Sequence, residues 1–110
     1  MTIQNRILKI AEDSRAASRR LAAVPSKVKD AALLAMSEGL IKNRDFLINE
    51  NSKDLQYARE KGISSAMMDR LTLTEATIES MAKGIKEVAA LPDPVGDIVH
   101  QYVHPNGLRI

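Results

Sequence analysis

The sequence has 110 residues, enough for one small domain; 45% are hydrophobic, 27% are charged and only 3% are aromatic, with a net charge of +2. The absence of cysteine excludes a disulfide framework, a thiolate metal site and a cysteine nucleophile within these residues. The sequence also shows no secretory signal pattern and no apolar run of the ~18 residues that a membrane helix needs, so we expect a cytoplasmic protein without a membrane partner.

The first 24 residues have the pattern of one long helix. Thr2 is suited to cap it, and the residue before Pro25 is driven out of helical geometry, which ends it. Its apolar stripe consists of Ile3, Ile7, Ile10, Ser14, Ala17, Leu21 and Val24. The stripe fits either packing on a larger body or a coiled-coil seam, and the seam would make the chain a self-contained helical dimerisation module.

Positive charge is concentrated at this end, because residues 1–29 hold seven basic and two acidic side chains. Arg15, Arg19 and Arg20 form a cluster that could contact nucleic-acid phosphates. Glu12 and Asp13 lie one turn earlier as ion-pair partners, and no aromatic residues are interleaved. The pattern therefore favours a solvent-exposed helix with salt bridges, and we expect no nucleic-acid partner.

The middle of the chain predicts further helices. A second one opens at Pro25-Ser26, and Gly39 and the run Asn43–Asp45 mark points where it would kink or split. Helix resumes over 50–60, and Gly62 is suited to end it. A short helix is predicted over 64–71, followed by a helix that Thr74 caps and that extends to about Ala90.

The pattern changes at Leu91. Residues 92–96 predict a turn, and residues 98–103 have the alternation of a strand. His104-Pro105-Asn106-Gly107 predicts a second turn, and residues 108–110 a return strand. Because a two-stranded hairpin is marginal alone, we expect it to need a third strand or a partner, and we expect the chain to be one part of a larger fold.

No catalytic or metal-binding constellation stands out. His100 and His104 are too few for a zinc site, and no glycine-rich phosphate loop is present, so we expect no metal ligand, catalytic group or cofactor-binding residue in this chain. Arg70 lies between two predicted helices, where its guanidinium would suit a carboxylate or an acyl phosphate. The favoured alternative is an ion pair within the Asp69-Arg70 region that fixes the loop.

Four strings in order resemble the N-terminal region of the gamma-glutamyl phosphate reductase (glutamate-5-semialdehyde dehydrogenase) family, within the aldehyde dehydrogenase superfamily. They are Glu50-Asn51-Ser52-Lys53-Asp54-Leu55 with Ala58 and Gly62, Met68-Asp69-Arg70-Leu71 with Leu73, Leu91-Pro92-Asp93-Pro94-Val95-Gly96, and Pro105-Asn106-Gly107-Leu108. The resemblance spans the whole chain but only the opening part of the family's length.

The resemblance implies a part of an enzyme of proline biosynthesis that uses NADPH to reduce L-glutamyl 5-phosphate to the semialdehyde. In such an enzyme a cysteine thiolate displaces phosphate, and hydride then releases the aldehyde. This chain has no cysteine and would not be catalytic by itself, and NADP would bind to residues outside it. Arg70 is then a candidate for the substrate's anionic end, and Asn51 a second candidate that could instead cap the following turn.

The expected architecture is mainly α, with four or five helices and a C-terminal β-hairpin, as the N-terminal part of an α/β aldehyde dehydrogenase-like fold. Residues 1–96 would be the helical N-terminal part of the dinucleotide-binding domain. Residues 97–110 would begin a β-hairpin arm for oligomerisation, which implies a homo-oligomer.

Overall fold

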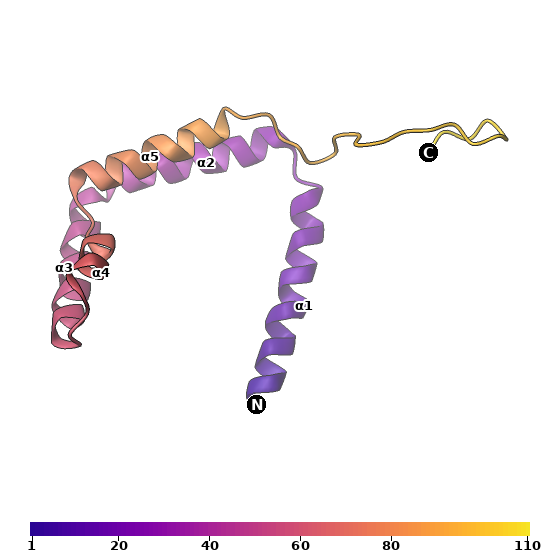
Figure 1. Ribbon diagram of the computed structural model, residues 1–110. Helices are drawn as coiled ribbons and strands as arrows, with labels where there is room; N and C mark the ends of the chain where they lie inside the picture. Colours follow the sequence, from indigo (N-terminus) through magenta and orange to yellow (C-terminus); the bar gives the residue numbers. More distant parts are fainter. The chain divides into compact units, whose positions relative to one another are not determined.

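The computed structural model describes all 110 residues and contains five helices: α1 (Ile3–Ala22), α2 (Ser26–Lys42), α3 (Arg44–Glu60), α4 (Ser65–Leu71) and α5 (Glu75–Ala89) (Figure 1). This confirms the prediction of a mainly helical chain. The contacts divide it into two units, residues 25–91 and residues 1–24 with 92–110.

Helix α1 begins where the sequence predicts. Thr2 caps it, since its Oγ1 accepts a hydrogen bond from the Asn5 backbone N–H at 3.1 Å. Every residue of the helix is at least partly exposed and none is buried, including Ile3 at 80% and Ile7 at 61%. The ion pair on its surface joins Lys9 to Asp13 at 3.1 Å, rather than Asp13 to one of the arginines that follow it. The amphipathic stripe is thus unpaired within the helix's own surroundings.

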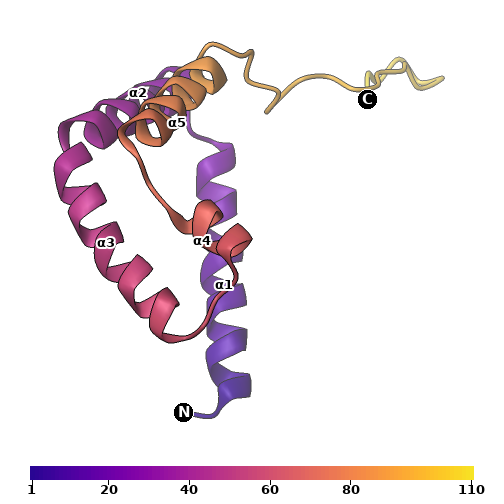
Figure 2. The same cartoon turned by 60° about the vertical axis from the view of Figure 1, so that its left-hand side comes forward.

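The unit over residues 25–91 is organised by α2 and α5, which pack antiparallel along their length (Figures 1 and 2). Their contact is built on small residues. Ser37 of α2 is fully buried and its Oγ donates to the Ala82 carbonyl oxygen at 2.8 Å, while Ala82 itself is 3% exposed. Ile78, one turn earlier on α5, is completely buried. The short side chains let the two helix backbones approach closely, and Ile78 supplies most of the apolar volume at the contact.

The predicted break near Asn43 is confirmed, because α2 ends at Lys42 and α3 begins at Arg44. The Asn43 side chain donates through Nδ2 to the Gly39 carbonyl at 2.7 Å, and the Asn43 backbone N–H uses the same oxygen. Side-chain bonding of this kind competes with the regular helix ladder. The chain therefore turns at Asn43 and sends α3 away from the α2–α5 pair.

Local capping accounts for the ends of the remaining helices. Gly62 has a φ of +71°, and the Gly62 and Ile63 backbone N–H groups donate to the Arg59 and Ala58 carbonyls, which is a Schellman ending for α3. Ser64 Oγ accepts from the Met67 N–H, and Thr74 Oγ1 accepts from the Thr77 N–H. Each cap lies where the sequence predicts it.

The predicted C-terminal hairpin is not formed as a pair of strands. Residues 98–110 contain one isolated antiparallel bridge, between Val103 and Arg109. Tyr102 and Ile110 exchange both backbone hydrogen bonds, and His104 N–H donates to the Leu108 carbonyl at 2.7 Å across the predicted turn. The turn is therefore correct and the strands are wrong. Three residues on the return side with no third strand are too few for a stable ladder.

The buried Ser37 hydroxyl makes a testable contribution to stability. We expect Ser37→Ala to lower the free energy of unfolding by about 1 kcal/mol, because it deletes the bond to Ala82. Ser80→Ala, at an exposed position of α5, is the matched control for the higher helix propensity of alanine. Urea unfolding followed by circular dichroism measures both. A Ser37→Ala protein as stable as Ser80→Ala would show that the bond contributes nothing.

Candidate functional site

Asn51, the first of the two predicted substrate contacts, lies on α3 and is 5% exposed. Its Nδ2 donates to the Leu71 carbonyl oxygen at 3.0 Å, and its Oδ1 accepts from the Leu73 N–H at 2.8 Å. The amide therefore bridges the last residue of α4 and the segment that leads into α5. The structure uses Asn51 to hold this connection rather than to cap a turn that follows it, and its contact with substrate stays a prediction.

Arg70, the second predicted contact, is exposed in the last turn of α4. It makes no ion pair with Asp69 or any other acidic side chain, so the favoured alternative of a loop-fixing ion pair is not found. Arg70 directly precedes Leu71, whose carbonyl Asn51 binds. The two candidates thus belong to one connection: Asn51 fixes the backbone at the end of α4, and Arg70 offers a charged group to solvent beside it.

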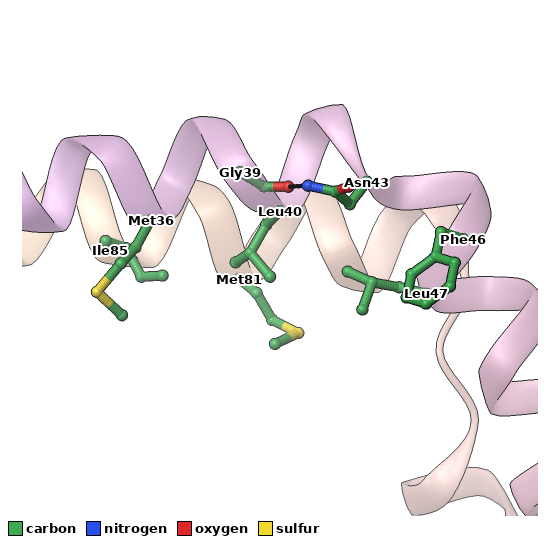
Figure 3. A pocket seen from close by; sticks show the side chains of 8 residues that line it. All are labelled: Met36, Gly39, Leu40, Asn43, Phe46, Leu47, Met81 and Ile85. Carbon is green, nitrogen blue, oxygen red and sulfur yellow. Dashed lines mark hydrogen bonds between the residues drawn. The ribbon is translucent and has the colours of Figure 1, made fainter.

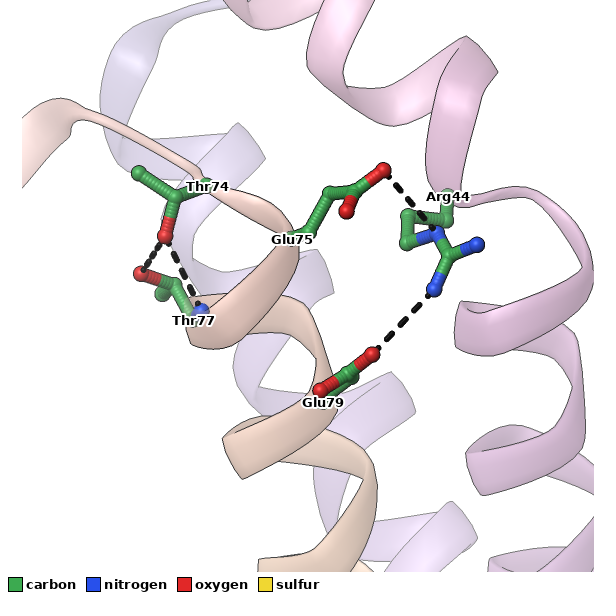
Figure 4. Close-up of polar contacts among 5 residues, drawn as sticks. All are labelled: Arg44, Thr74, Glu75, Thr77 and Glu79. Atoms are coloured by element: carbon green, nitrogen blue, oxygen red, sulfur yellow. Dashed lines mark hydrogen bonds and ion pairs between the residues drawn. The ribbon is translucent and has the colours of Figure 1, made fainter.

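An arginine that sequence reasoning did not single out, Arg44, is held by two carboxylates at the start of α3 (Figure 4). Its Nη1 lies 3.3 Å from Glu79 Oε1, and its Nε lies 3.8 Å from Glu75 Oε1. Its side chain is 33% exposed. Because these glutamates come from α5, Arg44 ties the α2–α3 corner to the beginning of α5. The only sequence signal is the helical spacing of Glu75 and Glu79.

A hollow of about 570 Å³ lies beside this corner, between α3 and the segment that begins α5. It is lined by Asp45, Ile48, Asn49, Ser52, Leu73, Thr74 and Glu75. Two of these side chains are acidic and none is basic. An anionic substrate such as an acyl phosphate would meet repulsion here, so this hollow does not suit the predicted ligand.

A second groove, of about 500 Å³, is formed by α2, the start of α3 and α5 (Figure 3). Its lining is Met36, Gly39, Leu40, Asn43, Phe46, Leu47, Met81 and Ile85. No ionisable side chain is among them. The one amide, that of Asn43, already donates to the Gly39 carbonyl. The groove offers apolar surface and no group that could catalyse a reaction.

Groups for metal or redox chemistry are not assembled. No three histidine, cysteine or acidic side chains come together as metal ligands. The His100 ring lies 5.8 Å from the Tyr102 ring in a tilted contact, and the His104 backbone takes part in the turn. None of the five helices has the length and hydropathy required to cross a bilayer.

The sequence matches no protein-family model. It is, however, similar along all 110 residues to curated gamma-glutamyl phosphate reductases. The protein of that name from Desulfatibacillum aliphaticivorans is 49% identical, that from Geobacter metallireducens 48% and that from Geotalea daltonii 46%, and the chain covers 26% of the length of each.

The same family appears among solved structures. The crystal structure of gamma-glutamyl phosphate reductase from Thermotoga maritima superposes with a TM-score of 0.82 at 32% identity, over 93% of this chain and 25% of that one. The chain therefore spans about a quarter of the length of these relatives. Over its whole length it belongs to the gamma-glutamyl phosphate reductase family, as the N-terminal quarter of that enzyme.

Proposed function

We propose that this chain supplies the N-terminal part of an NADPH-dependent reductase that converts L-glutamyl 5-phosphate to L-glutamate 5-semialdehyde and phosphate in proline biosynthesis. The observation that carries the proposal is the 46–49% identity to three reductases of that name over all 110 residues. The chain contributes scaffold and substrate contacts rather than chemistry. It has no cysteine for the nucleophile, and the residues present form no dinucleotide site, so both belong to the remainder of the enzyme.

Within this assignment, residues 1–96 form part of the dinucleotide-binding domain, and residues 97–110 serve in contacts between subunits of a homo-oligomer. The second assignment is supported by the apolar side chains that this segment leaves in solvent. Val99 is 98% exposed and Ile98 is 75% exposed, which is unfavourable unless another surface covers them. As a biosynthetic enzyme that draws on NADPH, the whole protein would act in the cytoplasm.

Helical dimerisation through the α1 stripe is the second candidate function, and the exposed residues of α1 are the observation that favours it. Ile7 and Ile10 are both 61% exposed and lie on one face. Ser14 and Ala17 interrupt that face with little apolar area, so the seam would be weak. The reductase assignment accounts for more of the chain, because the likeness to the relatives extends through α2–α5 as well.

The reductase assignment is tested with the product of the complete reading frame that contains this chain. We expect it to reduce NADP⁺ when supplied with glutamate 5-semialdehyde and inorganic phosphate, which is the reverse reaction, with NADPH formation followed by absorbance. Omission of phosphate is the control, since the acyl phosphate cannot form without it. NADPH formation that does not depend on phosphate, or none at all, would refute the assignment.

Arg70 is expected to bind the anionic end of the substrate. In the complete enzyme, Arg70→Ala should raise the KM for semialdehyde or phosphate about tenfold, which corresponds to the loss of about 1.4 kcal/mol of binding, with kcat little changed. Arg70→Lys should recover part of the effect, because lysine keeps the charge but not the planar fork. Arg59→Ala, at an exposed position of α3, is the matched control. A KM for Arg70→Ala equal to that of the control would contradict the role.

Asn51 is expected to support this contact through the backbone. Asn51→Ala removes two buried hydrogen bonds, so we expect the free energy of unfolding to fall by about 2 kcal/mol. Asn51→Asp keeps the acceptor for the Leu73 N–H and places a carboxylate oxygen against the Leu71 carbonyl, so it should be destabilising as well. Steady-state kinetics well below the midpoint of unfolding separate the two roles. An unchanged KM with reduced stability would restrict Asn51 to the α3–α4 connection.

A further inference from the structure

The apolar groove of the α2–α5 pair is not built for a small molecule. Binding sites for small ligands combine apolar walls with a few convergent polar groups that fix orientation. Here the one polar side chain, Asn43, has its Nδ2 within 2.7 Å of the Gly39 carbonyl of the same helix turn. Nothing else in the lining donates, accepts or carries charge. The groove is therefore a surface for apolar side chains of a protein.

Large side chains in the groove are left in contact with water. Phe46 is 62% exposed, Met36 57% and Met81 44% (Figure 3). By contrast, only Ala58, Ile78 and Ala82 are buried apolar residues in the whole chain. Continuous apolar surface of this kind marks an interface on a soluble protein. A cover on the groove would add a phenylalanine and two methionines to a core that is otherwise dominated by alanine.

Gly39 provides an independent sign that another surface approaches. It lies in the interior of α2, where glycine costs about 1 kcal/mol relative to alanine. A Cβ at this position would meet nothing within 4 Å. Packing within this chain therefore does not require a glycine, although Gly39 lines the groove. A contact from outside the chain, close enough to exclude a methyl group, gives the residue a purpose.

We propose that the groove is covered by an apolar segment from the remaining part of the same polypeptide, which makes a close contact at Gly39. This rests on the proposed function, because the chain matches only 26% of the reductases' length and most of such a polypeptide lies outside it. A cover that is covalently continuous with the groove avoids the entropy cost of association, and so it stays in place at any concentration. A second copy would have to pay that cost at an interface without charge complementarity.

The first test uses methionine oxidation in the product of the complete reading frame. With dilute hydrogen peroxide and mass spectrometry, we expect Met36 and Met81 to oxidise at least about tenfold more slowly than a methionine in a short model peptide. Equal rates would show an open groove and overturn the proposal. Protection that disappears on dilution would assign the cover to a second copy and overturn it as well. The assay needs no activity, so it is independent of whether the protein proves to be a reductase.

The second test uses the sign of a stability change. If the groove were open, Gly39→Ala would raise the Tm of the complete protein through helix propensity. We expect it instead to lower the Tm by about 2–4 °C relative to Gly84→Ala, because the added methyl group meets the covering segment. Gly84 is the matched control: it lies inside α5, its Cβ would meet nothing within 4 Å, and it does not line the groove. A Tm for Gly39→Ala equal to or above that of Gly84→Ala overturns the proposal.

Discussion

The unit over residues 25–91 depends on the close approach of α2 and α5 at Ser37 and Ala82. Two helices meet there with a hydroxyl and a methyl group between their backbones, and the serine hydroxyl is satisfied by a carbonyl of the opposite helix. That geometry fixes the register of the pair, because moving either helix by one residue would bury an unpaired hydroxyl. Ile78 then fills the space one turn away, and Arg44 closes the same seam through Glu75 and Glu79.

The other two helices are held to this pair by single polar side chains rather than by a broad apolar contact. Asn43 turns the chain out of α2 by bonding back to the Gly39 carbonyl. Asn51 returns the chain by gripping both sides of Thr72, through Leu71 and Leu73, so that α5 starts in the correct place. Because a buried amide must be fully paired to be tolerated, these two asparagines specify one path for the chain where apolar packing is sparse.

Sequence reasoning succeeded where structure is decided within a few neighbouring residues. Thr2, Ser64 and Thr74 cap helices, Gly62 ends one, and the Asn43 break follows from side chains that compete with their own backbone. It missed features that depend on residues distant in sequence. Ser37 reads as one more small helical residue until Ala82 faces it, and Asn51 gave no sign that its partners lie twenty residues on. The C-terminal strands failed for the same reason, since alternation predicts a strand but a ladder needs a neighbour.

The distribution of chemistry and of apolar surface follows from these constraints. The contacts that shape the chain use up the polar groups that could have served a ligand: Arg44 is held by glutamates, Asn43 and Asn51 by backbone. Arg70 is left as an exposed cation that no side chain of the chain neutralises. Meanwhile the large apolar residues lie outside the small buried core, on α1, in the groove and along 95–110. A chain that satisfies its polar groups internally and leaves its largest apolar groups in solvent is built to be covered, and its one free arginine acts within what covers it.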